Sequence, residues 1–138
     1  MEKIKIEDRF EVNDLLVKYC HYIDGRDWEK FRSLFIVDSL LDLSAFQGPV
    51  GSIDTAIEYF QSISGAIPKW QHTISTSLLS ASGESIKART AAQVMLVSSD
   101  DAVTFTGLWY NDEIVKTEEG WKFRSRSQEY GWIHNMQA

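Results

Sequence analysis

The sequence is poor in cysteine and proline. Among its 138 residues Cys20 is the single cysteine, so an internal disulfide is excluded, and only Pro49 and Pro68 are prolines. No run approaches the roughly 18 consecutive apolar residues of a membrane-spanning helix. The first residues alternate charge with isoleucine, unlike a secretory signal peptide. These absences predict one cytoplasmic domain over residues 1–138 with no internal linker.

Basic residues are also in deficit. Lys and Arg number 14 against 20 Asp and Glu, for a net charge of −6. Nucleic acid and anionic lipid both require basic surface, so we expect no nucleic acid and no membrane as partner. Aromatic residues are in excess instead, with five Trp, five Tyr and seven Phe. We expect some of these rings to line a space for an apolar ligand.

The first half of the chain carries helical spacing, because its apolar residues recur at three- and four-residue steps. The pattern predicts a helix from about Glu7 to Gly25 and a short second helix capped by Asp27. A third helix is expected to begin after the cap Ser52 and to end at Gly65.

From Trp70 onward the period changes to two, which is typical of strands. Trp70, His72, Ile74, Thr76 and Leu78 alternate with polar residues and should share one inner face.

Turn-forming residues separate three further long strands, near 85–97, 102–116 and 121–133. Helices followed by a run of antiparallel strands predict an α+β domain, with the helices packed on one face of a curved sheet.

The strand near 102–116 is apolar on both faces. Phe105 and Trp109 lie on one face and are expected to form a cavity wall, while Leu108 and Tyr110 lie on the other. Because two apolar faces should not both meet water, we expect a homodimer through the outer face of the sheet, with Tyr110 at the contact.

Asp24 is the first candidate for chemistry. It stands at the expected carboxyl end of the first helix, where the helix dipole disfavours a negative charge. A locally unfavourable residue of this kind is typical of functional sites. The alternative is structural: Asp24 belongs to a helix-ending Asp-Gly turn and caps the second helix.

His72 is the second candidate, because an imidazole on an inner strand face needs a hydrogen-bond partner. A His–Asp pair in an apolar cleft is the minimal general-base unit. The alternative is a core histidine bonded to a backbone carbonyl. Sequence order alone leaves open whether Asp24 and His72 meet.

Two further polar side chains have possible catalytic roles. The hydroxyl of Tyr19 could donate a proton to a leaving oxygen or polarise a carbonyl, and Arg126 could hold an anionic leaving group or a carboxylate. The alternatives are a core tyrosine and an arginine on a solvated strand face.

Other chemistries lack their motifs. The sequence contains no Gly-x-Ser-x-Gly elbow, no Gly-rich phosphate loop and no dinucleotide fingerprint. Its three dispersed histidines show no paired metal-ligand spacing. We therefore expect no metal site, although the sequence leaves a site made of carboxylates open. Proton transfer without a cofactor is the chemistry that is left.

Four segments carry a family resemblance: residues 19–28 (YCHYIDGRDW), 71–73 (QHT), 107–112 (GLWYND) and 120–123 (GWKF), the last followed by Arg126. Over nearly its whole length the chain resembles the SnoaL-like branch of the superfamily that includes nuclear transport factor 2, scytalone dehydratase and ketosteroid isomerase. The resemblance implies a cone, in which a strongly bent antiparallel sheet wraps three N-terminal helices around a deep apolar pocket.

The resemblance also implies site residues. In scytalone dehydratase, bile-acid 7α-dehydratase and hexachlorocyclohexane dehydrochlorinase a catalytic Asp ends the first helix and a His lies on the first long strand, the places of Asp24 and His72. The bile-acid enzyme has a tyrosine that Tyr19 matches, and the dehydrochlorinase has an arginine that Arg126 matches. Polyketide cyclases and ketosteroid isomerase use other constellations.

The leading hypothesis is therefore a cofactor-independent lyase that removes water or another group from a hydrophobic, cyclic small molecule. His72 is the general base, Asp24 orients it, and Tyr19 or Arg126 assists the leaving group. The substrate pocket is expected to include Cys20, Trp70, Phe105 and Trp109. The alternatives are an isomerase or polyketide cyclase with the same pocket, and a non-catalytic binding or assembly module in which Asp24 and His72 do not touch.

Overall fold

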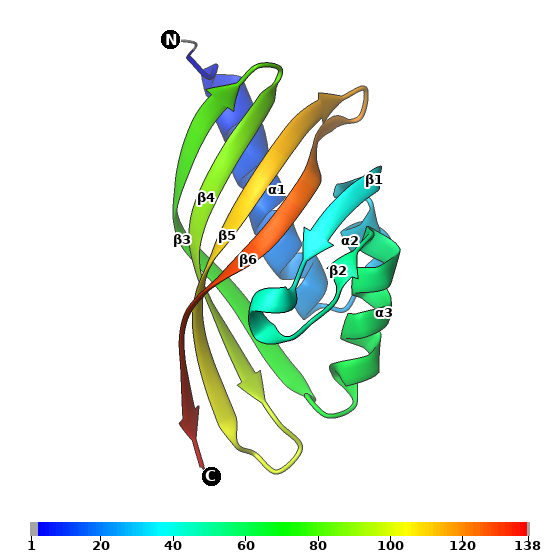
Figure 1. Cartoon of the computed structure of the whole chain (residues 1–138), viewed down its shortest axis with the longest axis vertical. Helices are drawn as coiled ribbons and strands as arrows, with labels where there is room; N and C mark the ends of the chain where they lie inside the picture. Colours follow the sequence, from blue (N-terminus) through cyan, green and yellow to red (C-terminus); the bar gives the residue numbers. More distant parts are fainter. Residues whose placement is uncertain (1–2, 138) are drawn as a thin grey trace.

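The computed structural model describes residues 3–137. Within this range the helices come first in the chain and the long strands last (Figure 1). The elements are α1 (Ile6–Asp24), α2 (Trp28–Arg32), β1 (Phe35–Asp42), the 3-10 helix η1 (Ser44–Phe46), β2 (Val50–Gly51), α3 (Ile53–Ser64), β3 (Lys69–Ser82), β4 (Ser85–Val97), β5 (Val103–Thr117) and β6 (Gly120–Met136). No helix in residues 3–137 combines the length and the apolar character needed to cross a bilayer.

The helices begin and end where the sequence pattern predicts. Asp27 accepts a hydrogen bond from the backbone N–H of Lys30 and caps α2, and Ser52 accepts one from Thr55 and caps α3. The apolar stripe of α1 is buried. The three helices therefore present their apolar sides to a common core.

The six strands form one sheet in the order β2-β1-β6-β5-β4-β3. Strands β3 to β6 are the predicted antiparallel meander. The sheet as a whole is mixed, however, because β1 joins β6 in parallel, with Phe35 opposite Phe123 and Leu41 opposite Arg126. This corrects the expectation of a purely antiparallel sheet: the apolar segment after α2 is a strand.

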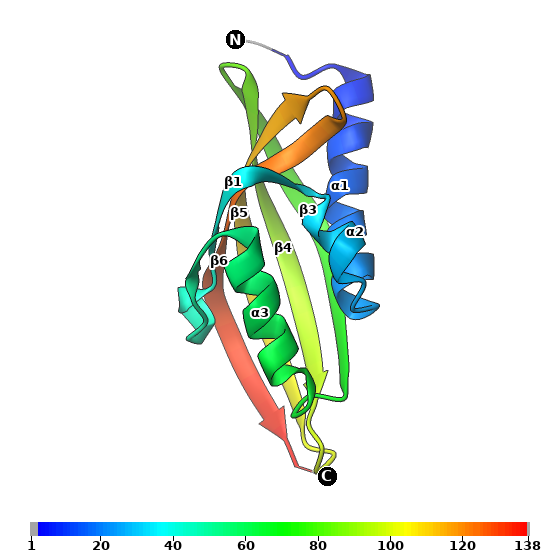
Figure 2. The same ribbon diagram turned by 90° about the vertical axis from the view of Figure 1, so that its right-hand side faces the viewer.

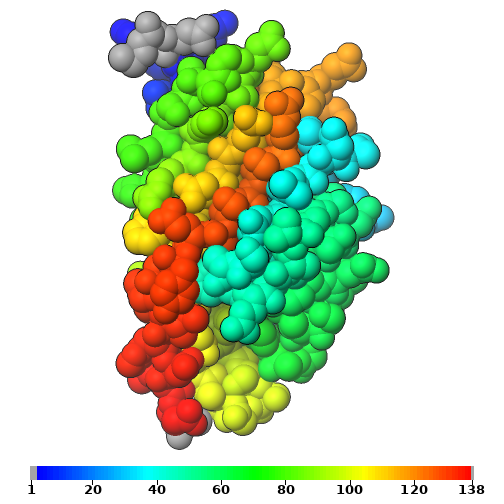
Figure 3. Space-filling model, viewed as in Figure 1, coloured from blue at the N-terminus to red at the C-terminus, as the bar shows by residue number. Residues whose placement is uncertain are grey.

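The sheet bends around the helices, with α1 along β3 and α3 next to β1 and β2 (Figure 2). In the space-filling view the segment from β1 to α3, coloured cyan to green, lies directly beside β6 in orange and red (Figure 3). A cavity lies between α3 and the inner face of the sheet.

Two predictions about strand faces are wrong. A register shift between Ile74 and Ser77 reverses the alternation of β3, so Leu78 is 75% exposed instead of facing inward. On β5 the inner face carries the residues of even number, so Tyr110 is completely buried and cannot reach a partner subunit. The homodimer through the outer face stays a prediction.

Candidate functional site

Asp24, the last residue of α1, contacts His72 near the start of β3. Oδ1 of Asp24 lies 2.7 Å from Nδ1 of the His72 ring, and both carboxylate oxygens lie 3.0 Å from the His72 backbone nitrogen. The side chains of His72 and Asp24 are 10% and 25% exposed. The sequence left open whether Asp24 and His72 meet, and in the structure they do. Helix α2 is capped by Asp27 and not by Asp24.

Neighbouring residues hold this contact in place. The indole N–H of Trp70 donates to the carbonyl of Ile23 at 2.9 Å, which satisfies one of the free carbonyls at the end of α1. Gly25 ends the helix, and Arg26 turns the chain away with a left-handed φ of 54°. Strand β3 is therefore bonded to the last turn of α1 at both Trp70 and His72.

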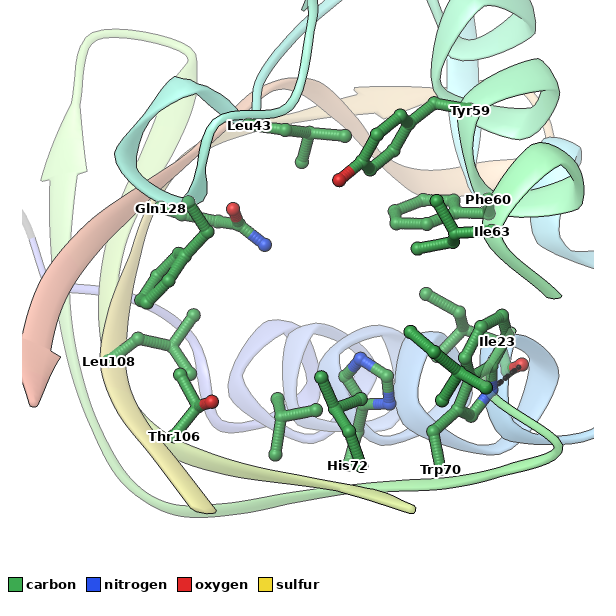
Figure 4. A pocket seen from close by; sticks show the side chains of 14 residues that line it. Ile23, Leu43, Tyr59, Phe60, Ile63, Trp70, His72, Thr106, Leu108 and Gln128 are labelled. Atoms are coloured by element: carbon green, nitrogen blue, oxygen red, sulfur yellow. Dashed lines mark hydrogen bonds between the residues drawn. The ribbon is translucent and has the colours of Figure 1, made fainter. Parts of the chain in front are cut away.

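The partner of Nδ1 determines the tautomer of His72. An ionised carboxylate only accepts hydrogen bonds, so Nδ1 carries a proton, and in the neutral ring Nε2 keeps its lone pair. The ring stands on the wall of a cavity (Figure 4). The arrangement leaves a proton acceptor facing the space where a ligand would lie.

The cavity has a volume of about 130 Å³ and lies between α3 and the inner face of the sheet. Four polar side chains stand on an otherwise apolar or aromatic wall, and no Lys or Arg contributes to it. The lining residues are Ile23, Leu43, Phe46, Tyr59, Phe60, Ile63, Ile67, Trp70, His72, Val94, Leu96, Thr106, Leu108 and Gln128.

Of the four predicted pocket residues, only Trp70 is part of this wall. Cys20 is buried in α1, where burial raises the pKa of its thiol to about 11. Phe105 and Trp109 stand on the outer face of β5, and Trp109 contacts the Arg89 guanidinium there. The prediction that these two rings form the cavity wall is wrong, because Thr106 and Leu108 occupy the inner face.

Arg126 also faces inward, against the solvated-face alternative. The pairing of β6 with β5 shows why. Ser125 pairs with Glu113, but the next pair along the ladder is Phe123 with Ile114, so Arg124 has no backbone partner on β5 and forms a β-bulge. Because of this extra residue, Arg126 faces the same side of the sheet as Phe123. The side chain of Arg126 is buried and bonds both oxygens of Asp112, at 2.7 and 2.9 Å.

Tyr19 lies between the Arg126–Asp112 ion pair and the Asp24–His72 pair, which we call the dyad. Its ring is 4.2 Å from the guanidinium carbon of Arg126 and meets the His72 ring edge-on, with centroids 6.4 Å apart. Burial raises the pKa of Tyr19 to about 12, although the charge of Arg126 opposes this rise. Neither Tyr19 nor Arg126 lines the cavity. Neither side chain therefore stands where a leaving group would sit.

Sequence reasoning missed three of the four polar wall residues: Tyr59, Thr106 and Gln128. Gln128 follows Arg126 at a spacing of two on β6 and so shares its inward side, and Tyr59 precedes the buried Phe60 on α3. The signal in the sequence was weak, because Gln128 reads as part of a solvated row until the bulge at Arg124 is known.

The model of the SnoaL-like domain family matches residues 5–127 of the chain. An uncharacterized protein of Mycobacterium tuberculosis is 29% identical over 124 residues, which cover 88% of this chain and 84% of that protein.

Two solved structures show the same fold. A protein of Novosphingobium aromaticivorans named as a candidate aromatic ring hydroxylase has a TM-score of 0.89 and 22% identity, covering 97% of this chain and 96% of that one. A hexachlorocyclohexane dehydrochlorinase, LinA-type3 of Novosphingobium barchaimii, has a TM-score of 0.84 and 12% identity, with 95% and 91% covered. At these identities the likeness shows the fold alone, and it confirms the predicted cone of helices and curved sheet.

Proposed function

The chain belongs to the SnoaL-like domain family, and from this premise we propose that it is a lyase that works without a cofactor. It eliminates water or another small group from a neutral, hydrophobic cyclic molecule. The observation that carries the proposal is the bonded pair of Asp24 and His72 on the wall of an apolar cavity. A name among the structural neighbours, hexachlorocyclohexane dehydrochlorinase, also describes an elimination.

In the proposed reaction His72 is the general base. Nε2 removes a proton from a carbon next to an activating group, and Asp24 stabilises the imidazolium that forms. General-base assistance of this kind contributes about 10² to 10⁴ in rate. A bound hydrophobic substrate displaces water from the apolar wall, which strengthens the electrostatic interactions among the groups inside.

We assign positioning roles to Tyr19 and Arg126. Tyr19 supports the His72 ring from behind, and Arg126, held by Asp112, supports Tyr19. In this proposal neither touches the substrate, so assistance to the leaving group must come from elsewhere on the cavity wall.

Product mass tests the reaction class. The protein is incubated in D₂O with a panel of hydroxylated and halogenated cyclic ketones, and products are analysed by mass spectrometry. An elimination gives a product that has lost water or hydrogen halide. Deuterium uptake without loss of a group indicates the isomerase or cyclase alternative, and no change with any compound favours the non-catalytic binding module.

Variants then test the dyad. His72→Gln and Asp24→Asn are expected to lower turnover by about 10² or more. The matched controls His21→Gln and Asp14→Asn change exposed residues of the same types on α1 and should leave turnover unchanged. Turnover that survives in both dyad variants removes the pair from the mechanism.

A further inference from the structure

The cavity has a second polar end, opposite His72. Tyr59 from α3 and Gln128 from β6 direct their polar atoms into the cavity from the far side (Figure 4). Within residues 3–137 no hydrogen bond is made by the Tyr59 hydroxyl or the Gln128 side-chain amide; the hydrogen bond at Tyr59 runs from the Ser62 hydroxyl to its backbone carbonyl. Polar groups facing an apolar space are stabilised by a partner. Water fills this role in the free protein, and a bound ligand with an acceptor atom takes its place.

Both groups are held by the fold. A Cβ atom at Gly48 would lie 2.7 Å from Cβ of Leu43 and 3.3 Å from Cε2 of Tyr59, so only glycine lets this loop close against the Tyr59 ring. Gln128 pairs with Tyr110 in the ladder between β5 and β6, which fixes its backbone in the middle of the sheet. The Tyr59 ring and the backbone of Gln128 are therefore held in position before a ligand arrives.

Their chemistry fits one kind of ligand atom. A tyrosine hydroxyl donates one hydrogen bond, an amide nitrogen donates up to two, and the oxygen of a carbonyl accepts two. The Gln128 amide lies at the cavity with its nitrogen inward (Figure 4), and no protein partner among the described residues opposes this orientation when an acceptor is bound. A carboxylate is a poor match, because no Lys or Arg lines the wall to balance its charge.

We propose that Tyr59 and Gln128 bind the carbonyl oxygen of the substrate, and that the substrate is a single-ring ketone with its leaving group β to the carbonyl. We infer the size from the cavity volume of about 130 Å³, since an engineered apolar cavity of about 150 Å³ holds one benzene molecule. This inference rests on the proposed elimination, and it names the substrate class and two further catalytic residues.

The step balances for 3-hydroxycyclohexanone as a model substrate. His72 takes a proton from C2, and the electron pair of that C–H bond forms an enolate whose oxygen is stabilised by Tyr59 and Gln128. The enolate re-forms the carbonyl while the C2–C3 double bond forms and the C3–O bond breaks. The departing hydroxide takes the proton from the His72 imidazolium and leaves as water, giving cyclohex-2-enone.

Binding of the product tests the inference without turnover. Cyclohex-2-enone and cyclohexene have similar rings, but only the first has a carbonyl. Tyr59→Phe and Gln128→Leu are each expected to weaken cyclohex-2-enone binding by about 3- to 10-fold, with cyclohexene binding unchanged. The controls Tyr22→Phe and Gln93→Leu, which lie outside the cavity wall, should bind both compounds as the wild type does.

Infrared difference spectroscopy gives a second measurement. The carbonyl band of bound cyclohex-2-enone should lie at lower wavenumber than in hexane, and it should move back toward the hexane value in either variant. An unshifted band in the wild type, no measurable binding of cyclohex-2-enone, or an equal loss of both probes in the variants overturns the inference. The wild-type band decides the matter even if a variant does not fold.

Failure of the base and failure of the carbonyl site are distinguishable. If His72→Gln turns over 3-hydroxycyclohexanone normally while the variants at Tyr59 and Gln128 still discriminate cyclohex-2-enone from cyclohexene, the proposed base is wrong and the carbonyl site stands. The reverse result leaves the base and removes the carbonyl site.

Discussion

Asp24 contacts His72 at two places, its ring and its backbone. One carboxylate oxygen lies 2.7 Å from the ring nitrogen Nδ1, and both oxygens lie 3.0 Å from the backbone nitrogen. The backbone contact fixes where β3 passes the end of α1, and the ring contact fixes the tautomer of the imidazole. A single carboxylate therefore sets both the position and the protonation pattern of the proposed base.

Asp24→Asn separates these two effects. The asparagine oxygen can still accept from the His72 backbone N–H, so the free energy of unfolding should fall by no more than about 1–2 kcal/mol. The neutral amide no longer dictates which ring nitrogen is protonated, so ¹⁵N chemical shifts of His72 should show a smaller fraction of the Nδ1–H tautomer. The same shifts in Asp14→Asn should match those of the wild type, and an unaltered tautomer in Asp24→Asn contradicts the assigned role.

The sequence predicted those parts of the fold whose pattern is local. Repeating apolar spacing, or caps and turns at the ends, marks the helices α1 and α3 and the strands β3 to β6. The observed bounds of each of these elements lie close to the predicted ones. Strand β1 has no clean alternation, and its partner β6 lies far along the chain. Its parallel pairing depends on tertiary packing, which a single sequence does not encode in any short window.

Bulges account for the errors in facing. One extra residue in a strand moves every following side chain to the opposite face, which is why Leu78 points outward and Arg126 inward. Asp24 was found because a negative charge is unfavourable at the carboxyl end of a helix. His72 was found because an imidazole on an apolar strand face needs a hydrogen-bond partner. Tyr59 and Gln128 were missed because neither is unusual within its own element, and only the folded chain brings them together on one cavity wall.

The buried pair of Arg126 and Asp112 should be costly to break. Burial disfavours the charge of Arg126, but the facing carboxylate outweighs this and raises the pKa of the guanidinium above its ordinary value. Asp112→Ala leaves that charge buried without a partner and should lower the free energy of unfolding by about 3–5 kcal/mol. Urea denaturation followed by circular dichroism measures the change.

A double variant identifies the cause. Replacing the pair with apolar residues of similar size, Asp112→Leu with Arg126→Met, should recover most of the lost stability because no unpaired charge remains. Glu113→Ala is the control, since Glu113 makes an ion pair with Arg124 on the outer face at 3.2 Å, and it should cost less than about 1 kcal/mol. A double variant as unstable as Asp112→Ala alone would show that the cost comes from lost packing.

Buried tyrosine predicts a loss of stability in alkali. The pKa of Tyr19 is about 12 in the folded protein because burial disfavours the phenolate, against about 10 in an unfolded chain. Between these values the unfolded state has lost the proton that the folded state keeps, so unfolding becomes more favourable as pH rises. The stability contributed by Tyr19 is complete below pH 10 and declines by about 1.4 kcal/mol per pH unit up to pH 12.

Denaturation at several pH values from 8 to 12 measures this slope. Cys20 acts with the same sign from about pH 9, the ordinary value for its thiol, because burial raises its pKa to about 11. Tyr19→Phe removes one titrating group and should flatten the curve above pH 10, whereas Tyr22→Phe, at a half-buried position, serves as the matched control. Equal slopes in the wild type and Tyr19→Phe refute the assignment.

Arg26 should stabilise the rim of the cavity. Its guanidinium donates to the carbonyls of Ser64 and Ile67, at 3.2 and 2.5 Å, and lies 3.9 Å from the centre of the Trp70 ring. Ile67 and Trp70 both line the cavity. Arg26→Ala removes these contacts and should lower the free energy of unfolding by about 1–3 kcal/mol, and amide hydrogen exchange should accelerate in residues 65–70.

Backbone strain at Arg26 allows a finer comparison. Its φ of 54° lies in the left-handed region, which glycine adopts without cost and other residues adopt at about 1 kcal/mol or more. Arg26→Gly removes the same side-chain contacts but relaxes this strain, so it should be more stable than Arg26→Ala while showing the same faster exchange in residues 65–70. Arg32→Ala, which breaks the exposed pair with Asp54, should leave exchange there unchanged. Slow exchange in residues 65–70 of Arg26→Gly would contradict this prediction. It would show that the backbone conformation at Arg26, and not the guanidinium contacts, holds the turn from Ser64 to Ile67 in place.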